Sequence, residues 1–212
     1  MRKLLLGAAA VALPVGILAS SAGIAGASKA PPVDLSHASV TCTTVTGAAK
    51  FGPGITSSGT SPENVNIKLA LSGCTASGVS GVTVMSGKGA GILHLASNNA
   101  TTLFGTNPVL GGHINIKWAT SPKPVFKMST VTVTMITGAV SGNYGSFAVA
   151  AGQASVANDF AGSDNGASSS LYVETTQTTT ALAASLTASK GLKVVNFGTD
   201  GTHLKGNSIT LG

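Results

Sequence analysis

The segment Asn64-Val-Asn-Ile-Lys-Leu-Ala-Leu71 alternates strictly between large apolar residues and polar or small ones. A period of two residues places Val65, Ile67, Leu69 and Leu71 on one face of an extended chain. In a helix the same four residues would spread around the axis and could not share one core. The segment therefore predicts a β-strand that has one face in the core and the other face in solvent.

Similar strand-like runs recur along most of the chain. They cover Val40–Thr46, Gly81–Ser86, Gly91–Ala96, His113–Ala119, Thr130–Thr137, Ser146–Ala150, Gln153–Phe160, Leu192–Phe197 and Ser208–Leu211. Glycine and polar clusters between the runs predict turns, namely Gly52-Pro53-Gly54, Ser57-Ser58-Gly59, Gly87-Lys88-Gly89, Gly111-Gly112 and Asp164-Asn165-Gly166. Short strands at this spacing are typical of an all-β fold. We expect an antiparallel β-sandwich, either Ig-like or jelly-roll-like.

One late segment has the pattern of a helix instead. Leu182 and Leu186 are four residues apart among alanines, and Lys190-Gly191 is a helix-stop signal. The pattern predicts one short helix near 178–189. Earlier in the chain, residues 40–48 and 131–139 share six of nine residues, which raises the option that the sandwich consists of two related halves.

The N-terminus has the pattern of an export signal. Arg2 and Lys3 precede the apolar run Leu4–Leu18, and Ala25-Gly26-Ala27 fits the small-residue rule for cleavage. We expect residues 1–27 to be a signal peptide, 28–36 a flexible lead-in and 37–212 a single β-sandwich domain. An uncleaved anchor is the alternative, but the apolar run is shorter than the ~20 residues that span a bilayer. We predict no membrane span after signal cleavage.

The chain contains two cysteines, Cys42 and Cys74. In an exported protein such a pair predicts a disulfide, because the compartment is oxidising. Two free thiols or a metal-binding pair are the alternatives, although no histidines accompany them at zinc-site spacing.

The charge distribution argues against nucleic-acid binding. Without residues 1–27 the chain has no arginine, and ten scattered lysines face six acidic residues. Phosphate recognition favours the guanidinium fork and clustered positive charge. We therefore expect no nucleic-acid partner.

No sequence motif indicates catalysis or a cofactor. A Gly-x-Ser-x-Gly motif is absent, and the four histidines, His37, His94, His113 and His203, stand in unrelated contexts. A hydrolase with residues brought together only by the fold remains open. Asp159 and Asp164 lie in the one segment rich in oxygen ligands, which makes them a weak candidate for a calcium site beside the simpler reading as a turn.

Three aromatic residues are weak candidates for ligand binding. Trp118, Tyr144 and Tyr172 could stack on sugar rings if their side chains were exposed on one face. Aromatic residues are scarce in this chain, however, so a place in the core is the competing interpretation.

Four sequence stretches are similar to those of a known group of proteins, and the similarity extends over most of the chain after residue 27. They are Val40-Thr-Cys-Thr43, Leu71-Ser-Gly-Cys74, Val84-Met-Ser-Gly-Lys-Gly89 and Gly162-Ser-Asp-Asn-Gly-Ala-Ser-Ser169. The chain resembles uncharacterised small secreted β-rich proteins of high-GC Gram-positive bacteria. It has a weaker similarity to pilin-type Ig-like subunits, which also join an early strand to a later Leu-x-Gly-Cys strand. Neither resemblance implies an activity or functional residues.

From these observations we expect a secreted protein, either extracellular or associated with the cell wall. We expect it to act as a non-enzymatic interaction module. Its expected partner is an extracellular protein or a cell-wall component. A secreted hydrolase and a carbohydrate-binding module are the alternatives.

Overall fold

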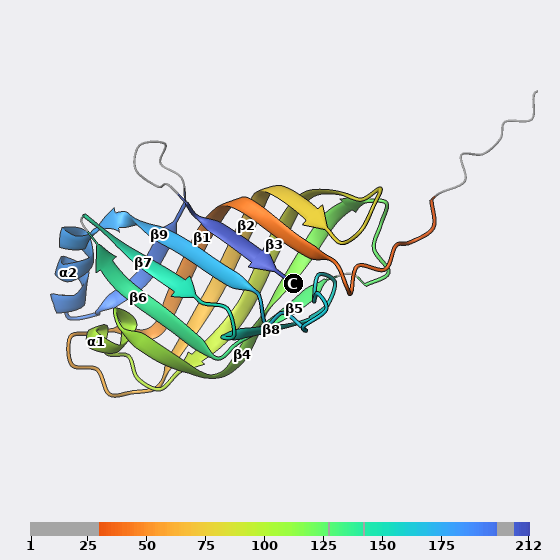
Figure 1. Ribbon diagram of the computed structural model, residues 1–212. Coiled ribbons are helices and arrows are strands. Elements are labelled where there is room, and N and C mark those ends of the chain that lie inside the picture. Colours follow the sequence, from red (N-terminus) through yellow and green to blue (C-terminus); the bar gives the residue numbers. More distant parts are fainter. Residues whose placement is uncertain (1–29, 127, 142, 199–205) are drawn as a thin grey trace, which may run out of the picture.

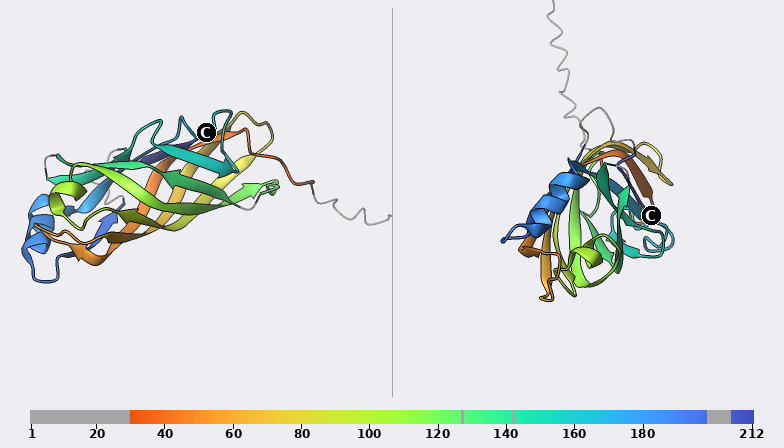
Figure 2. Two further views of the ribbon diagram at one scale, coloured as in Figure 1. Left: turned by 90° about the horizontal axis from the view of Figure 1, so that it is seen from below. Right: turned by 90° about the vertical axis from the view of Figure 1, so that its left-hand side faces the viewer.

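A computed structural model describes residues 30–126, 128–141, 143–198 and 206–212. Eleven strands account for most of the described chain, and every pairing between them is antiparallel. The predicted all-β, antiparallel, sandwich-like fold is therefore confirmed. Its elongated body is shown in Figures 1 and 2.

The strands have the following bounds: β1 Ser39–Ile55, β2 Glu63–Ser77, β3 Thr83–Leu95, β4 Thr106–Ser121, β5 Ser129–Val133, β6 Met135–Ser141, β7 Tyr144–Val149, β8 Ala154–Asn158, β9 Ser170–Thr178, β10 Leu192–Phe197 and β11 Ser208–Leu211. Two helices complete the described chain, α1 Ala100–Leu103 and α2 Thr179–Thr187.

The two layers of the sandwich are joined at both edges. Strand order runs β3-β2-β1-β10-β9-β7-β6-β4, and β4 pairs in turn with β3, so that these eight strands form a closed sheet. Strand β5 pairs with β4 and β8, while β11 bridges β1 and β9. Closure leaves β1–β4 without an unpaired edge along most of their length, which removes a surface prone to edge-to-edge aggregation.

The alternating segment of β2 occupies the position that its pattern predicts. Val65, Leu69 and Leu71 are buried and Ile67 is half-buried, whereas the residues between them are exposed. On the neighbouring strand, Cys42 lies opposite Cys74, and the two form the predicted disulfide.

The cluster Gly87-Lys88-Gly89 is not a turn, contrary to the sequence prediction, but the middle of β3. Three glycines in this strand, Gly87, Gly89 and Gly91, each lie between a large side chain of β2 and one of β4. The triplets are Leu71–Gly87–Trp118, Leu69–Gly89–Ile116 and Ile67–Gly91–Ile114. A Cβ on Gly87 would lie 2.7 Å from the Trp118 ring. The glycines therefore leave room for large inward-facing side chains from both neighbours.

Two further glycine clusters predicted as turns also lie within strands. Gly111-Gly112 belongs to β4, where a Cβ on Gly112 would lie 2.0 Å from the carbonyl oxygen of Ile92 on β3. Gly52-Pro53-Gly54 lies near the end of β1 and contains a cis Gly52–Pro53 bond. Gly112 and Gly54 each permit the close approach of a neighbouring segment, and the strand continues through both clusters.

The run Thr130–Thr137 is divided at Thr134 into β5 and β6, which pair with different neighbours. Residues 40–48 lie instead within the single strand β1. The two similar segments therefore occupy unlike positions in the sheet, and the structure gives no support to related halves.

Helix α2 confirms the predicted late helix, with slightly narrower bounds. Its N-cap is Thr178, whose side chain accepts a hydrogen bond from the backbone N–H of Ala181. The buried Leu182 anchors it to the core. Helix α1 was not predicted, and both helices lie at the same end of the closed sheet (Figure 2).

The N-terminal part of the described chain is packed on the opposite end of the sheet. Leu35 is fully buried, and its carbonyl oxygen accepts a hydrogen bond from the Phe160 N–H at 2.8 Å. Val33 forms a bridge with Pro124. Within the predicted lead-in 28–36, Leu35 therefore belongs to the core and Val33 packs against it. The predicted signal peptide lies outside the described residues.

Candidate functional site

Four lysines form a diagonal row on the outer surface of the closed sheet. Lys50, Lys68, Lys88 and Lys117 come from the four consecutive strands β1, β2, β3 and β4, and all are exposed. Their alternation with the inward-facing residues fixes this orientation. Each strand therefore contributes one cation to the same face.

The strand register determines the spacing of this lysine row. Lys68 pairs with Ala48, two residues from Lys50, and with Ala90, two residues from Lys88. Such diagonal neighbours are about 7–8 Å apart. Lys88 then lies directly opposite Lys117. With about 4.8 Å between strands and 3.4 Å per residue, the row would extend over roughly 20 Å of a flat sheet.

No acidic side chain shares this outer surface of β1–β4. The only acidic residue in these four strands is Glu63, and it is buried, with 1% of its surface exposed. Like charges on directly opposed residues destabilise a sheet. The lysine row therefore carries positive charge without an acidic neighbour in these strands, and we expect the directly opposed pair Lys88 and Lys117 to destabilise the sheet.

A shallow groove of about 350 Å³ adjoins the lysine row. Lys50, Asn66 and Lys68 line it together with small residues such as Ala48 and Ala90. Ile92, 45% exposed, adds an apolar surface at the rim. The groove thus combines two cations, an amide and an apolar contact.

Trp118, a predicted ligand-binding candidate, lies in the core. Its ring packs edge-on against Phe160 at 5.1 Å between centroids, and its Nε1–H donates to Ser129 Oγ at 2.7 Å. The ring is therefore not available as a sugar-binding platform.

Tyr144 and Tyr172 are both half-buried, on β7 and β9 respectively. The Tyr172 hydroxyl donates to Glu174 Oε1 at 2.9 Å. Burial, aided by this hydrogen bond, raises the pKa of Tyr172. The structure does not bring Trp118 together with them on one exposed face.

The two carboxylates of the calcium hypothesis have different environments. Asp164 is exposed and accepts hydrogen bonds from the Gly166 N–H and from the N–H and hydroxyl of Ser168. These hydrogen bonds, that of the Ser168 hydroxyl foremost, lower the pKa of Asp164. Its oxygens thus stabilise a turn, as the simpler interpretation predicts.

Asp159, in contrast, is fully buried, and neither of its carboxylate oxygens has a hydrogen-bond partner. Burial raises its pKa to about 7, and the negative charge of Asp34 adds to the effect. The described residues contain no group of three or more His, Cys, Asp or Glu side chains that could hold a metal ion.

His94 and His113 are diagonal neighbours on the outer surface of β3 and β4, where no carboxylate accompanies them. His94, on the outer surface of β3, bonds through Nδ1 to Asn64 Oδ1 at 2.7 Å. His113 pairs with Ile92 on the same surface, and His203 lies outside the described residues. In the part of the chain that is described, no helix is long and apolar enough to cross a membrane.

Sequence reasoning treated the lysines as scattered and missed their alignment. The alternation around Lys68 was visible, but the registers of β1, β3 and β4 were not. Comparison with protein-family models, with curated proteins and with solved structures found no match to this chain.

Proposed function

We propose that the protein is a non-enzymatic extracellular module that binds a linear acidic polysaccharide along its lysine row. The observation that carries the proposal is the uninterrupted run of Lys50, Lys68, Lys88 and Lys117 across four paired strands with no acidic side chain among them. Complementary charge would recover the stability that the mutual repulsion of these lysines costs.

An extended polymer suits this surface better than a single anion. A row of roughly 20 Å matches repeated charges along a chain, whereas a small anion would engage one or two lysines. Lysine presents a compact point charge on a flexible stem, so it tolerates carboxylates at varying angles. The Asn66 amide in the groove could hydrogen-bond sugar hydroxyls.

Two features favour a polysaccharide over a nucleic acid. The chain after residue 27 has no arginine, and the outer faces of β1–β4 carry no Phe, Tyr or Trp side chain on which bases could stack. The export signal in the sequence and the disulfide agree with an extracellular partner.

The test is binding to polygalacturonate, with neutral dextran as the control polymer, by calorimetry over a range of NaCl concentrations. We expect binding to polygalacturonate alone and an affinity that falls with salt. The double variant Lys68→Gln/Lys88→Gln should lose about tenfold in affinity, which corresponds to about 1.4 kcal/mol.

The matched control is Lys123→Gln/Lys190→Gln, which removes the same charge from exposed positions outside β1–β4. Retention of affinity in this variant supports the lysine row as the site. An equal loss in both variants would show that net charge alone governs binding, and the proposal would fail. Tighter binding to polyphosphate, single-stranded DNA or anionic phospholipid vesicles would also overturn it.

A further inference from the structure

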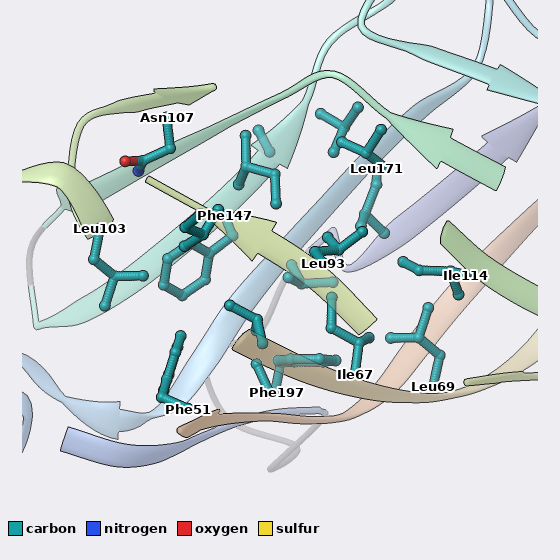
Figure 3. A pocket seen from close by; sticks show the side chains of 18 residues that line it. Phe51, Ile67, Leu69, Leu93, Leu103, Asn107, Ile114, Phe147, Leu171 and Phe197 are labelled. Atoms are coloured by element: carbon teal, nitrogen blue, oxygen red, sulfur yellow. The ribbon is translucent and has the colours of Figure 1, made fainter. Parts of the chain in front are cut away.

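The inner and outer faces of the closed sheet offer different chemistry to a ligand. An apolar cavity of about 80 Å³ lies between the two layers, and Asn107 is the one polar residue among the eighteen that line it (Figure 3). That lining is unsuited to a charged group, because an unpaired ion among apolar side chains is strongly disfavoured. Recognition of an anionic ligand is therefore confined to the outer face.

Two histidines lie on this outer face, beside the groove that adjoins the lysine row. His113 on β4 pairs directly with Ile92 on β3, which lines the groove, and His94 lies two residues further along β3. Both imidazole side chains are exposed. Diagonal neighbours of this kind are about 7–8 Å apart, so the two rings form one small group.

Strand register places the histidines across the groove from the lysines. One line of directly paired residues crosses the four strands β1 to β4, namely Lys50, Asn66, Ile92 and His113. With about 4.8 Å between strands, Lys50 and His113 would be roughly 14 Å apart on a flat sheet. Asn66 and Ile92, which line the groove, lie between these two ends. A sugar chain in the groove would have ammonium groups on one side and imidazole rings on the other.

A hydrogen bond orients one of the two rings. His94 Nδ1 bonds to Asn64 Oδ1 at 2.7 Å. An amide oxygen only accepts hydrogen bonds, so Nδ1 carries the hydrogen and Nε2 is the atom that takes up a proton. Cδ2, the ring atom bonded to Nε2, lies 3.9 Å from the position of a Cβ on Gly111 of β4. The ring therefore lies over β4, the strand of His113, and protonation leaves its bond to Asn64 intact.

No carboxylate faces the two rings from the neighbouring strands. Asn64 on β2, Ile92 on β3 and Gly111 on β4 are uncharged, and Ser129–Val133 of β5 contains no titratable side chain. Segment 96–112, which joins β3 to β4, contains none either. Glu63 on β2 is buried, so the charges on this face are those of the lysine row.

We infer that His94 and His113 form a second anion subsite of the polysaccharide site, which holds carboxylates of the polymer when the rings are protonated, so that binding tightens in mild acid. The inference rests on the proposed function, because the same polymer occupies the same groove. Histidine is the side chain that gains charge between pH 8 and pH 5. Lysine ammonium groups and carboxylates keep their charge over that range.

The experiment measures the affinity for polygalacturonate by calorimetry at pH 7.5 and pH 5.5, at equal ionic strength. We expect binding to be about 3- to 10-fold tighter at pH 5.5, as two exposed ion pairs allow. Because a nearby carboxylate favours the charged form of a ring, binding at pH 6.5 should also take up protons. Buffers with different ionisation enthalpies reveal this uptake in the measured heat.

Two double variants and one control test the assignment. His94→Gln/His113→Gln should abolish both the tightening and the proton uptake. His94→Lys/His113→Lys makes the charge permanent, so its affinity should be equal at the two pH values. The control His37→Gln removes an exposed histidine that lies before β1 and should keep both effects. Asp159 also titrates in this range, with a pKa of about 7, but its contribution would persist in the glutamine variant.

The outcomes separate this inference from the proposed function. Equal affinities at the two pH values in the unaltered protein would overturn the subsite and leave the lysine row as the site. Tightening that persists in His94→Gln/His113→Gln would also overturn the subsite. Absence of binding at both pH values would overturn the proposed function, and the inference with it. If the glutamine variant fails to fold, the lysine variant and the proton uptake of the unaltered protein still decide.

Discussion

Lys88 on β3 lies directly opposite Lys117 on β4, and both side chains are exposed on the outer surface of the closed sheet. Opposed residues in antiparallel strands have Cβ atoms about 4.5–5.5 Å apart, close enough for two ammonium groups to repel. An arrangement that costs stability at this position has a physical explanation if a negatively charged ligand binds there. The pair therefore links the stability of the fold to the proposed function.

Replacing Lys88 by Glu should separate these two effects. The new carboxylate would face Lys117 and convert repulsion into attraction, which should raise the free energy of unfolding by about 0.2–1 kcal/mol. The same change should weaken binding to polygalacturonate. Urea denaturation and calorimetry measure the two quantities, and Lys123→Glu in the loop before β5 provides the control. A variant that is less stable and binds as before would contradict the expectation.

The inward-facing glycines of β3 should be intolerant of any side chain. A Cβ on Gly91 would lie 2.0 Å from the carbonyl oxygen of His113. Gly91→Ala should therefore lower the free energy of unfolding by about 1–3 kcal/mol, the usual effect of overpacking. Gly52→Ala is the matched control, because its Cβ would meet no atom within 4 Å. Thermal unfolding of the two variants compares them, and similar melting temperatures would argue against the close packing of β3 and β4.

The buried carboxyl of Asp159 should make stability depend on pH. Its pKa is raised to about 7 in the folded protein, compared with about 3.9 in an unfolded chain. The folded state therefore holds a proton that the unfolded state releases, and stability should fall as the pH rises from about 4 to about 7.

Asp159→Asn should flatten this fall in stability, measured by urea denaturation across the same pH range. Burial also raises the pKa of Glu63, which contributes a fall of the same sign, whereas the lowered pKa values of Asp34 and Asp164 contribute with the opposite sign. Asp164→Asn serves as the control. Because the pKa of Asp164 is lowered in the folded protein, its carboxylate makes stability rise with pH, and its removal should not flatten the fall. If Asp159→Asn left the pH dependence of the free energy of unfolding unchanged, the Asp159 carboxyl would have the same pKa in the folded and the unfolded protein.

The disulfide should contribute substantially to stability. Cys42 and Cys74 are 32 residues apart, and closing such a loop is worth about 3.7 kcal/mol in the chain-entropy model. Cys42→Ser/Cys74→Ser should lose roughly that amount in urea denaturation. Reduction of the disulfide in the unaltered protein should lower the free energy of unfolding by a similar amount. A loss below about 1 kcal/mol would indicate that the disulfide adds little to the constraint that strand pairing already places on this loop.

The predictions from sequence succeeded where local pattern decides structure. The alternation in Asn64–Leu71 correctly gave a half-buried strand, and the bounds Leu192–Phe197 and Ser208–Leu211 are those of β10 and β11. Turn predictions from glycine held for Ser57-Ser58-Gly59 and Asp164-Asn165-Gly166 but failed for Gly87-Lys88-Gly89 and Gly111-Gly112, where the glycines serve close approach between strands. Local sequence does not distinguish a glycine that turns the chain from one that makes room for a neighbour.

By itself, the sequence determined the strand periodicity, the late helix and the availability of two cysteines for pairing, because these depend on neighbouring residues and on composition. Only the tertiary structure decided that the sheet closes on itself, that four lysines distant in sequence align, and that a cavity with Asn107 in its wall lies inside. Strand register and closure arise from contacts between residues far apart in the chain, and a shift of one residue would turn each lysine to the other face.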